Sequence, residues 1–217
     1  MQRDPTGSSF CWRKCSALAR RDGNRAWAAL FEYNRAMLRS ILGLISPSQK
    51  KRISESNAVE VILTALRRSA AELPAALQEA FEGKLGGLVI RNPDDAVAAS
   101  FLALAAIELE SLENIFPQQE ARRLGWKFSA AIQGKLDADA YVEFGRYRAA
   151  CLDRSRREPL HRLGELLLFR LLNPGSTDGP SPLEVSPLKT ILTVTHLVHC
   201  CGTWKRLTET YVIVPDR

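Results

Sequence analysis

The sequence has few of the features that mark membrane, secreted or disulfide-linked proteins. No apolar run approaches the ~18–20 uncharged residues that a membrane-spanning helix requires. The opening MQRDPTGSSFCWRKC also lacks the apolar segment of a secretory signal. The 217 residues contain 5 cysteines, an odd number that cannot all pair within one chain. We therefore expect a cytoplasmic protein in a reducing environment, with no membrane partner.

Motifs of enzyme chemistry are missing as well. The chain contains no G-x-S-x-G, no Walker-type glycine-rich loop and no G-x-G-x-x-G. Its 3 histidines lie near no convincing pair of nucleophile and acid in the sequence. One E-x-x-H occurs at 158–161, but the di-iron bundles that use this motif need a second copy, which the sequence lacks. We predict a protein that is not an enzyme and needs no cofactor.

Helical patterns dominate what is present. Aromatic residues make up only 7% of the chain, whereas Ala and Leu are abundant, a balance that favours helix over sheet. The clearest helix is predicted at 22–45, where apolar side chains recur at helical spacing opposite a basic face. Asn34 lies within that apolar stripe, so it needs a buried partner or marks a contact surface.

Similar periodicity predicts the rest of the fold. Further helices are expected at about 57–69, 74–85, 95–116, 117–134, 137–153, 157–172 and 188–201. The helix at 95–116 is the most apolar and is expected to be central. We predict an all-α fold, a helical bundle of about eight or nine helices, with TYVIVP forming one short C-terminal strand or an extended tail.

Charge and composition divide the chain into four regions. These are a basic N-terminal helical region at 1–72, a helical bundle core at 73–172, a linker or loop at 173–187, and a C-terminal helix with an extended tail at 188–217. Residues 1–70 hold 13 Lys and Arg against 5 Asp and Glu, whereas the remaining residues hold 17 against 19. This basic lobe indicates either an anionic partner, with nucleic acid first, or a solvated surface.

Seven basic side chains are the predicted contacts to nucleic acid. Each would neutralise phosphate, so that affinity would fall steeply with salt. They are Arg35, Arg39, Lys50, Lys51, Arg52, Arg67 and Arg68.

Residues 16–69 also carry two motif fragments. The first is a small apolar helix ending in A-x-x-G-D, followed by A-x-x-x-L-F-x-x-x-R-x-x-L; the residues that fit it are Gly23, Ala28, Leu30, Phe31, Arg35 and Leu38. A basic turn followed by a helix-opening segment is matched at Arg52, Ile53, Ser56, Val59 and Leu63. In these positions the run resembles region 2 of extracytoplasmic-function sigma factors, which implies docking on core RNA polymerase and a role in transcription.

The sequence departs from that family in two places. The acidic residues and glutamine of the family's second motif are replaced by Ser54, Asn57 and Glu60. Residues 75–217 contain no recognisable helix-turn-helix resembling region 4, the part that reads the promoter's upstream element.

The stretch 193-TVTHLVHCCGTWKRL-207 raises the question of a metal site. On a helix, His196, His199 and Cys200 share one face, and Cys11 and Cys15 lie one helical turn apart near the other terminus. Together these side chains have the chemistry of a tetrahedral zinc site. The spacing matches no recurrent zinc pattern, and free cysteine is among the most buried residue types. We therefore favour apolar core over zinc.

Three functional hypotheses follow. The first is a non-enzymatic regulatory protein associated with nucleic acid or a transcription complex through its basic lobe. The second is a helical adaptor that binds protein and no nucleic acid, with Asn34 and the helix at 157–172 at the interface. The third, and the weakest, is a metal- or redox-dependent helical protein that uses the Cys/His cluster.

Overall fold

The computed structural model describes residues 50–82, 86–153, 160–175 and 185–216. They belong to one compact unit, Lys50–Arg217. The predicted helix at 22–45, with Asn34, lies outside the described residues.

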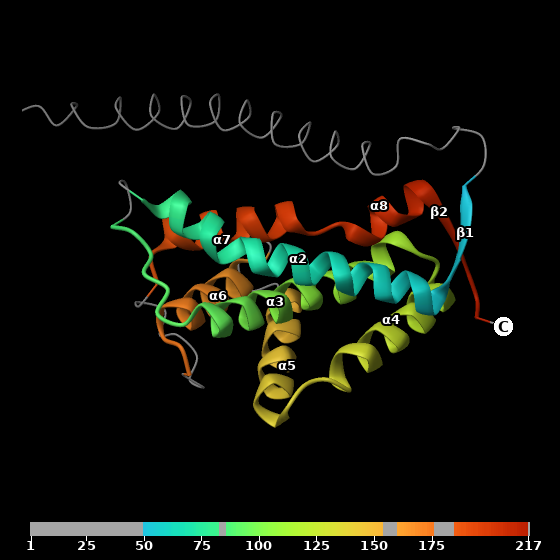
Figure 1. Ribbon diagram of the computed structural model, residues 1–217, viewed down its shortest axis with the longest axis horizontal. Helices are drawn as coiled ribbons and strands as arrows, with labels where there is room; N and C mark the ends of the chain where they lie inside the picture. The colour runs from blue at the N-terminus through green and yellow to red at the C-terminus, as the bar shows by residue number, and fades with distance from the viewer. Residues whose placement is uncertain (1–49, 83–85, 154–159, 176–184, 217) are drawn as a thin grey trace, which may run out of the picture. The chain divides into compact units, whose positions relative to one another are not determined.

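The described elements are mostly helices (Figure 1). In chain order they are β1 (Lys51–Ser54), α2 (Glu55–Phe81), α3 (Pro93–Ile115), α4 (Gln118–Gln133), α5 (Ala138–Leu152), α6 (His161–Leu172), α7 (Pro187–Cys200), α8 (Thr203–Thr210) and β2 (Tyr211–Val214). The helical prediction is confirmed. The described ranges hold seven helices, fewer than the eight or nine predicted for the whole chain.

Helix α3 lies at the centre of this unit. It packs against α2, α4, α5, α6, α7 and α8 (Figure 1). Residues 102–106, an uninterrupted run of Leu and Ala, are all buried, because the helix has neighbours on nearly every side. The central position expected from its apolar sequence is confirmed.

Helix α2 corrects the prediction of two helices at 57–69 and 74–85. It continues through Pro74, and through residues 72 and 73, where the sequence predicts a domain boundary. Proline removes one backbone hydrogen bond and crowds the preceding turn. Here Leu73, Pro74 and Leu77 are all buried, so the apolar face of α2 remains packed on both sides of the proline.

Helix α2 also begins two residues before the predicted start at about residue 57. The helix begins at Glu55, and the Ser54 hydroxyl accepts a hydrogen bond from the Asn57 N–H at 3.3 Å. This is the usual N-cap geometry, in which the cap precedes the donor by three residues.

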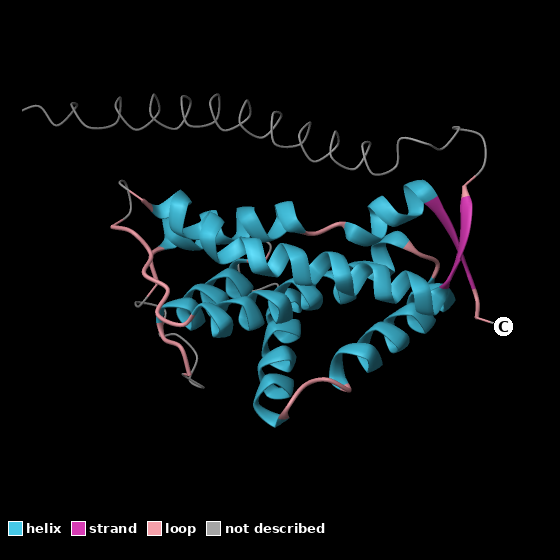
Figure 2. Ribbon diagram, viewed as in Figure 1, coloured by secondary structure: helices cyan, strands magenta, loops and turns pink. Residues whose placement is uncertain are grey.

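The short strand expected at TYVIVP is present as β2, and its partner is β1 (Figure 2). The two strands run parallel, with Lys51 opposite Tyr211 and Ser54 opposite Val214. The sequence predicts a basic turn here and no strand, so β1 is a correction. Its partner lies 160 residues further along the chain, too far for a local pattern to reveal.

The segment from α7 to β2 is part of the body. Helix α7 packs against α6 and α2, and α8 packs against α3 and α2. Most of the predicted linker at 173–187 lies outside the described residues. Among the helices of the described ranges, none combines the length and the apolarity needed to cross a membrane.

Candidate functional site

A groove lies between the helices α3, α4 and α5. The groove is open to solvent and has a volume of about 200 Å³. Its lining comes from three helices and consists of Leu109, Glu110, Leu112, Glu113, Ala121, Arg122, Gly125, Ser129 and Arg148. We call this the α3–α5 groove.

Apolar side chains form the base of the groove around Gly125, although more of its accessible surface is polar than apolar. Leu112 and Ala121 are buried beneath it, and Leu109 is half-buried. A methyl group added at Gly125 would lie 3.5 Å from Leu112 Cδ1 and 3.6 Å from Leu109 Cδ1, which are ordinary contact distances. The glycine therefore leaves space over these leucines that any other residue would fill.

The rim of the groove carries four charged side chains, of which two are paired. Arg148 Nε donates to Glu110 Oε1 at 2.8 Å. Glu113 and Arg122 are exposed and form no ion pair or hydrogen bond with the rest of the described chain. The rim thus offers one free carboxylate and one free guanidinium above an apolar floor.

The size and chemistry of the groove limit what it can hold. Small-molecule and cofactor sites usually have volumes of ~300–1,000 Å³, more than this cavity provides. No group of three or more potential metal ligands occurs in the described ranges. An apolar floor with a charged rim is instead typical of a pocket that receives a side chain from another protein.

Two exposed aromatic side chains lie on the helices that line the groove. Trp126 is 73% exposed and lies one helical turn from both Arg122 and Ser129 on α4, so it shares their side of the helix. On α5, Tyr141 is 53% exposed and lies two turns before Arg148 on the same face. Tryptophan and tyrosine are enriched in protein interfaces.

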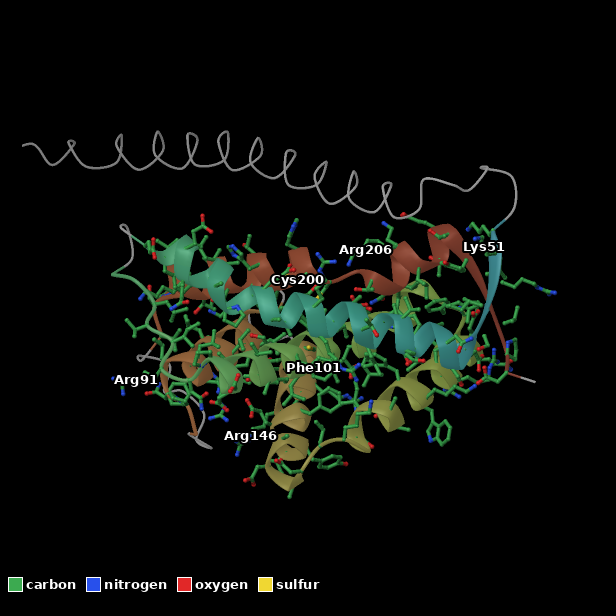
Figure 3. The ribbon with its side chains drawn as sticks, viewed as in Figure 1. Lys51, Arg91, Phe101, Arg146, Cys200 and Arg206 are labelled. Atoms are coloured by element: carbon green, nitrogen blue, oxygen red, sulfur yellow. The ribbon has the colours of Figure 1, made fainter. Side chains whose placement is uncertain are left out.

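The predicted nucleic-acid contacts fall into separate places. Arg35 and Arg39 lie outside the described residues. Lys50 Nζ donates to the Thr208 carbonyl at 2.8 Å, whereas Lys51 (Figure 3) and Arg52 on β1 are exposed with no partner in the described ranges.

Arg67 and Arg68 lie on the exposed side of α2, far from β1. They stand 12 and 13 residues beyond the start of that helix, or roughly 18 Å along its axis. Arg68 is paired with Glu72 at 3.2 Å. The five predicted contacts that the structure describes therefore do not form one basic patch.

The predicted zinc ligands are only partly described. Cys11 and Cys15 lie outside the described residues. His196 Nδ1 is 2.9 Å from the Leu192 carbonyl of its own helix. Burial lowers the pKa of His199 and raises the pKa of the Cys200 thiol to about 11. Without a bound metal, Cys200 (Figure 3) is therefore a protonated thiol at neutral pH.

The helix at 157–172, predicted to lie at an interface, is described from His161 as α6. Four leucines of this helix are buried in the core: Leu163, Leu167, Leu168 and Leu171. Its amphipathic pattern is therefore satisfied by packing within the body.

A buried carboxylate on α3 forms a polar contact that the sequence pattern does not reveal. Glu108 is fully buried, and its Oε1 accepts a hydrogen bond from the Thr203 N–H at 2.7 Å. It thereby satisfies a backbone donor at the first residue of α8.

A second network joins both ends of the described unit to α4. Glu55 is 2% exposed and pairs with Arg123 at 2.9 Å and Lys127 at 2.8 Å. Lys127 also pairs with Asp216, which accepts from the Ser56 backbone N–H at 3.1 Å and from the Ser56 hydroxyl. We call these five side chains the Glu55–Asp216 clamp.

The clamp changes the pKa values of its carboxyl groups. Hydrogen bonds from Lys127 and Ser56 hold the pKa of Asp216 far below its usual range. Burial raises the pKa of Glu55, but hydrogen bonds from Lys127 and Arg123 outweigh it, so that the net pKa is lowered. Both groups are therefore held as carboxylates.

The chain matches no protein-family model, no curated protein and no solved structure. The resemblance of residues 16–69 to sigma-factor region 2 accordingly stays a prediction.

Proposed function

We propose that the chain is a non-enzymatic helical protein that binds another protein through the α3–α5 groove. The observation that carries this proposal is the pairing of an open apolar floor at Gly125 with the unpartnered Glu113 and Arg122 on the rim. The cavity suits one inserted apolar side chain, and the free charges set its orientation.

The charge of the groove favours protein over nucleic acid as its ligand. Two carboxylates, Glu110 and Glu113, lie beside two guanidinium groups, whereas a phosphate-binding surface would be uniformly basic. Residues 50–217 hold 22 Lys and Arg against 21 Asp and Glu, so the body as a whole is nearly neutral. The expected partner presents an apolar residue flanked by one basic and one acidic side chain.

The test begins with a photo-crosslinking amino acid at Ser129, which lines the groove. A protein crosslinked from this position in cells is then purified and its affinity is measured by calorimetry. Reversing one rim charge, by Arg122→Glu or Glu113→Lys, should weaken binding at least about tenfold, which corresponds to about 1.4 kcal/mol.

Matched control variants reverse exposed charges elsewhere. Arg67→Glu and Glu60→Lys on α2 change the same charges outside the groove. They are expected to leave the affinity unchanged. Equal losses for the groove and control variants would count against the groove as the binding site.

Association with nucleic acid or a transcription complex is the second candidate. It is supported by Lys51 and Arg52, two exposed cations without a partner in the described ranges. Residues 1–49 add 8 Lys and Arg against 3 Asp and Glu. The resemblance of residues 16–69 to sigma-factor region 2 agrees with this candidate.

This candidate is tested by binding of the full chain to DNA and RNA across a salt series. Each lost phosphate contact should reduce the log–log slope by about 0.7–0.9. The triple variant Lys50→Ala, Lys51→Ala, Arg52→Ala should lower the slope, whereas the control triple Arg91→Ala, Lys135→Ala, Lys205→Ala should not. An unchanged slope in the first variant would exclude β1 as a contact.

A further inference from the structure

The β1–β2 sheet is small for a parallel sheet. It has two strands of four residues each, and in the described ranges β2 has a backbone partner on one side only. Parallel strands normally occur in larger sheets that are covered on both faces, and a two-stranded sheet is marginal by itself. A sheet of this kind is open to extension at its edges.

The two faces of the sheet differ. Ile53, Tyr211 and Ile213 pack against the hydrophobic core. Arg52 and Val212 stand opposite each other in the register and are exposed, Val212 at 46%. Side chains alternate between the two faces of a strand, so Val212 points to the uncovered face.

The two edges also differ. Strand β1 carries Lys51 and Arg52, and charged side chains on an edge strand oppose further pairing. Strand β2 reads Tyr-Val-Ile-Val, with no charge, and Pro215 follows it. The sheet thus has one protected edge and one uncharged apolar edge. It lies at one end of the described unit (Figure 2).

We propose that the free edge of β2 pairs antiparallel with β2 of a second copy of this chain, about a twofold axis. Identical strands can pair about a twofold axis only in the antiparallel direction, and the result is a four-stranded sheet in the order β1-β2-β2-β1. The absence of charge on β2 means that no like charges meet where the two copies join.

The same arrangement explains why the assembly stops at two copies. Both outer edges of the four-stranded sheet are β1 strands with Lys51 and Arg52. Any further copy would have to pair with a charged edge. The interface shares no residue with the α3–α5 groove, so this proposal stands independently of the proposed function.

The test is the mass of the full chain by sedimentation equilibrium, from low micromolar to near-millimolar concentration. We expect a reversible monomer–dimer equilibrium that is weak, because an interface of this size is at the small end of the known range. Val212→Lys should raise the dissociation constant at least about tenfold by placing like charges near the axis.

Two further variants make the result specific. Val61→Lys, on α2, changes a valine of nearly equal exposure, 45%, and should leave the dissociation constant unchanged. A mixture of Val212→Lys and Val212→Glu chains should recover the dimer as a heterodimer, because opposite charges then meet. This recovery also shows that the variant chains are folded.

Three outcomes would overturn the proposal. The first is a monomer at the highest concentration. The second is a dimer that Val212→Lys weakens no more than Val61→Lys does. The third is protection of every β2 amide from hydrogen exchange at concentrations where the chain is still monomeric, because another part of the same chain would then cover the edge.

Discussion

Glu108 shows how one residue can determine where an element begins. It is a carboxylate within the most apolar and most buried helix, and it accepts the Thr203 N–H at the start of α8. The preceding Gly202 has a φ of +81°, which lets the chain turn sharply into that position. A sequence pattern places Glu108 on a helix but cannot identify a donor 95 residues away.

Replacing Glu108 tests this role. In Glu108→Ala the Thr203 N–H stays buried without an acceptor, so the free energy of unfolding should fall by roughly 1–3 kcal/mol. Glu108→Gln retains an acceptor oxygen and should recover most of that loss. Urea denaturation of both variants measures the difference. Equal stabilities of the two variants would show that the hydrogen bond is not what the carboxylate contributes.

Gly125 is the residue whose replacement separates stability from binding. Its added methyl group meets only ordinary contacts, so Gly125→Ala should stabilise α4 by about 0.5–1 kcal/mol. The same methyl group occupies the floor of the α3–α5 groove and should weaken the binding of the proposed partner. Thermal denaturation and calorimetry on one preparation test both effects, and tighter binding would contradict the groove.

At the scale of elements, the contact between α6 and α7 depends on Gly164. A methyl group there would lie 2.5 Å from Val194 Cγ2 and 3.2 Å from the Thr190 carbonyl, which is too close without movement of α7. Glycine normally weakens a helix interior. At this position its lack of a side chain lets the two helices approach.

The matched pair Gly164→Ala and Gly145→Ala separates these effects. We expect Gly164→Ala to destabilise the protein by roughly 1–3 kcal/mol through overpacking. Gly145 on α5 has no heavy atom within 4 Å of the added methyl group. Gly145→Ala should therefore stabilise by about 0.5–1 kcal/mol. Denaturation curves that shift in the same direction for both variants would refute the close approach.

The Glu55–Asp216 clamp gives the stability a dependence on pH. The folded-state pKa of Asp216 lies below its unfolded value, so its contribution is complete above the unfolded pKa and declines as the pH falls through the folded one. The stability difference between wild type and Asp216→Asn should be constant above about pH 5 and should shrink in acid below about pH 4.

Lys127→Met removes the same ion pair from the other side. Because Lys127 pairs with both Glu55 and Asp216, this variant should lose more stability at neutral pH than Asp216→Asn. The double variant should show non-additivity. Additive losses, measured by urea denaturation at several pH values, would mean that the two side chains act independently.

Local patterns predict several elements of this fold well. The helices α3, α4, α5 and α7 follow from their apolar spacing, and α5 begins where predicted, with Asp137 as its cap: the Asp137 Oδ1 accepts the Ala140 N–H at 2.8 Å. The uninterrupted α2 is not predicted, because the packing of Pro74 compensates for its missing donor. Strand β1 and helix α8 depend on partners far away in the sequence.

At the scale of the whole molecule, the candidate site is less predictable than the fold. The groove combines residues of three helices, and only their arrangement in space leaves Glu113 and Arg122 unpaired. An exposed aromatic residue on a basic helix face, Trp126, is the one local signal. The basic residues are easy to list from the sequence, but the described ones are divided between β1 and α2.

The parallel register of β1 and β2 has a mechanical consequence. The described unit begins at β1 and ends just after β2, and the two strands run in the same direction. A force that pulls residue 51 and residue 214 apart therefore slides one strand along the other. All hydrogen bonds of the pair resist such shear together, whereas a force that opened the pair from one end would break them one at a time.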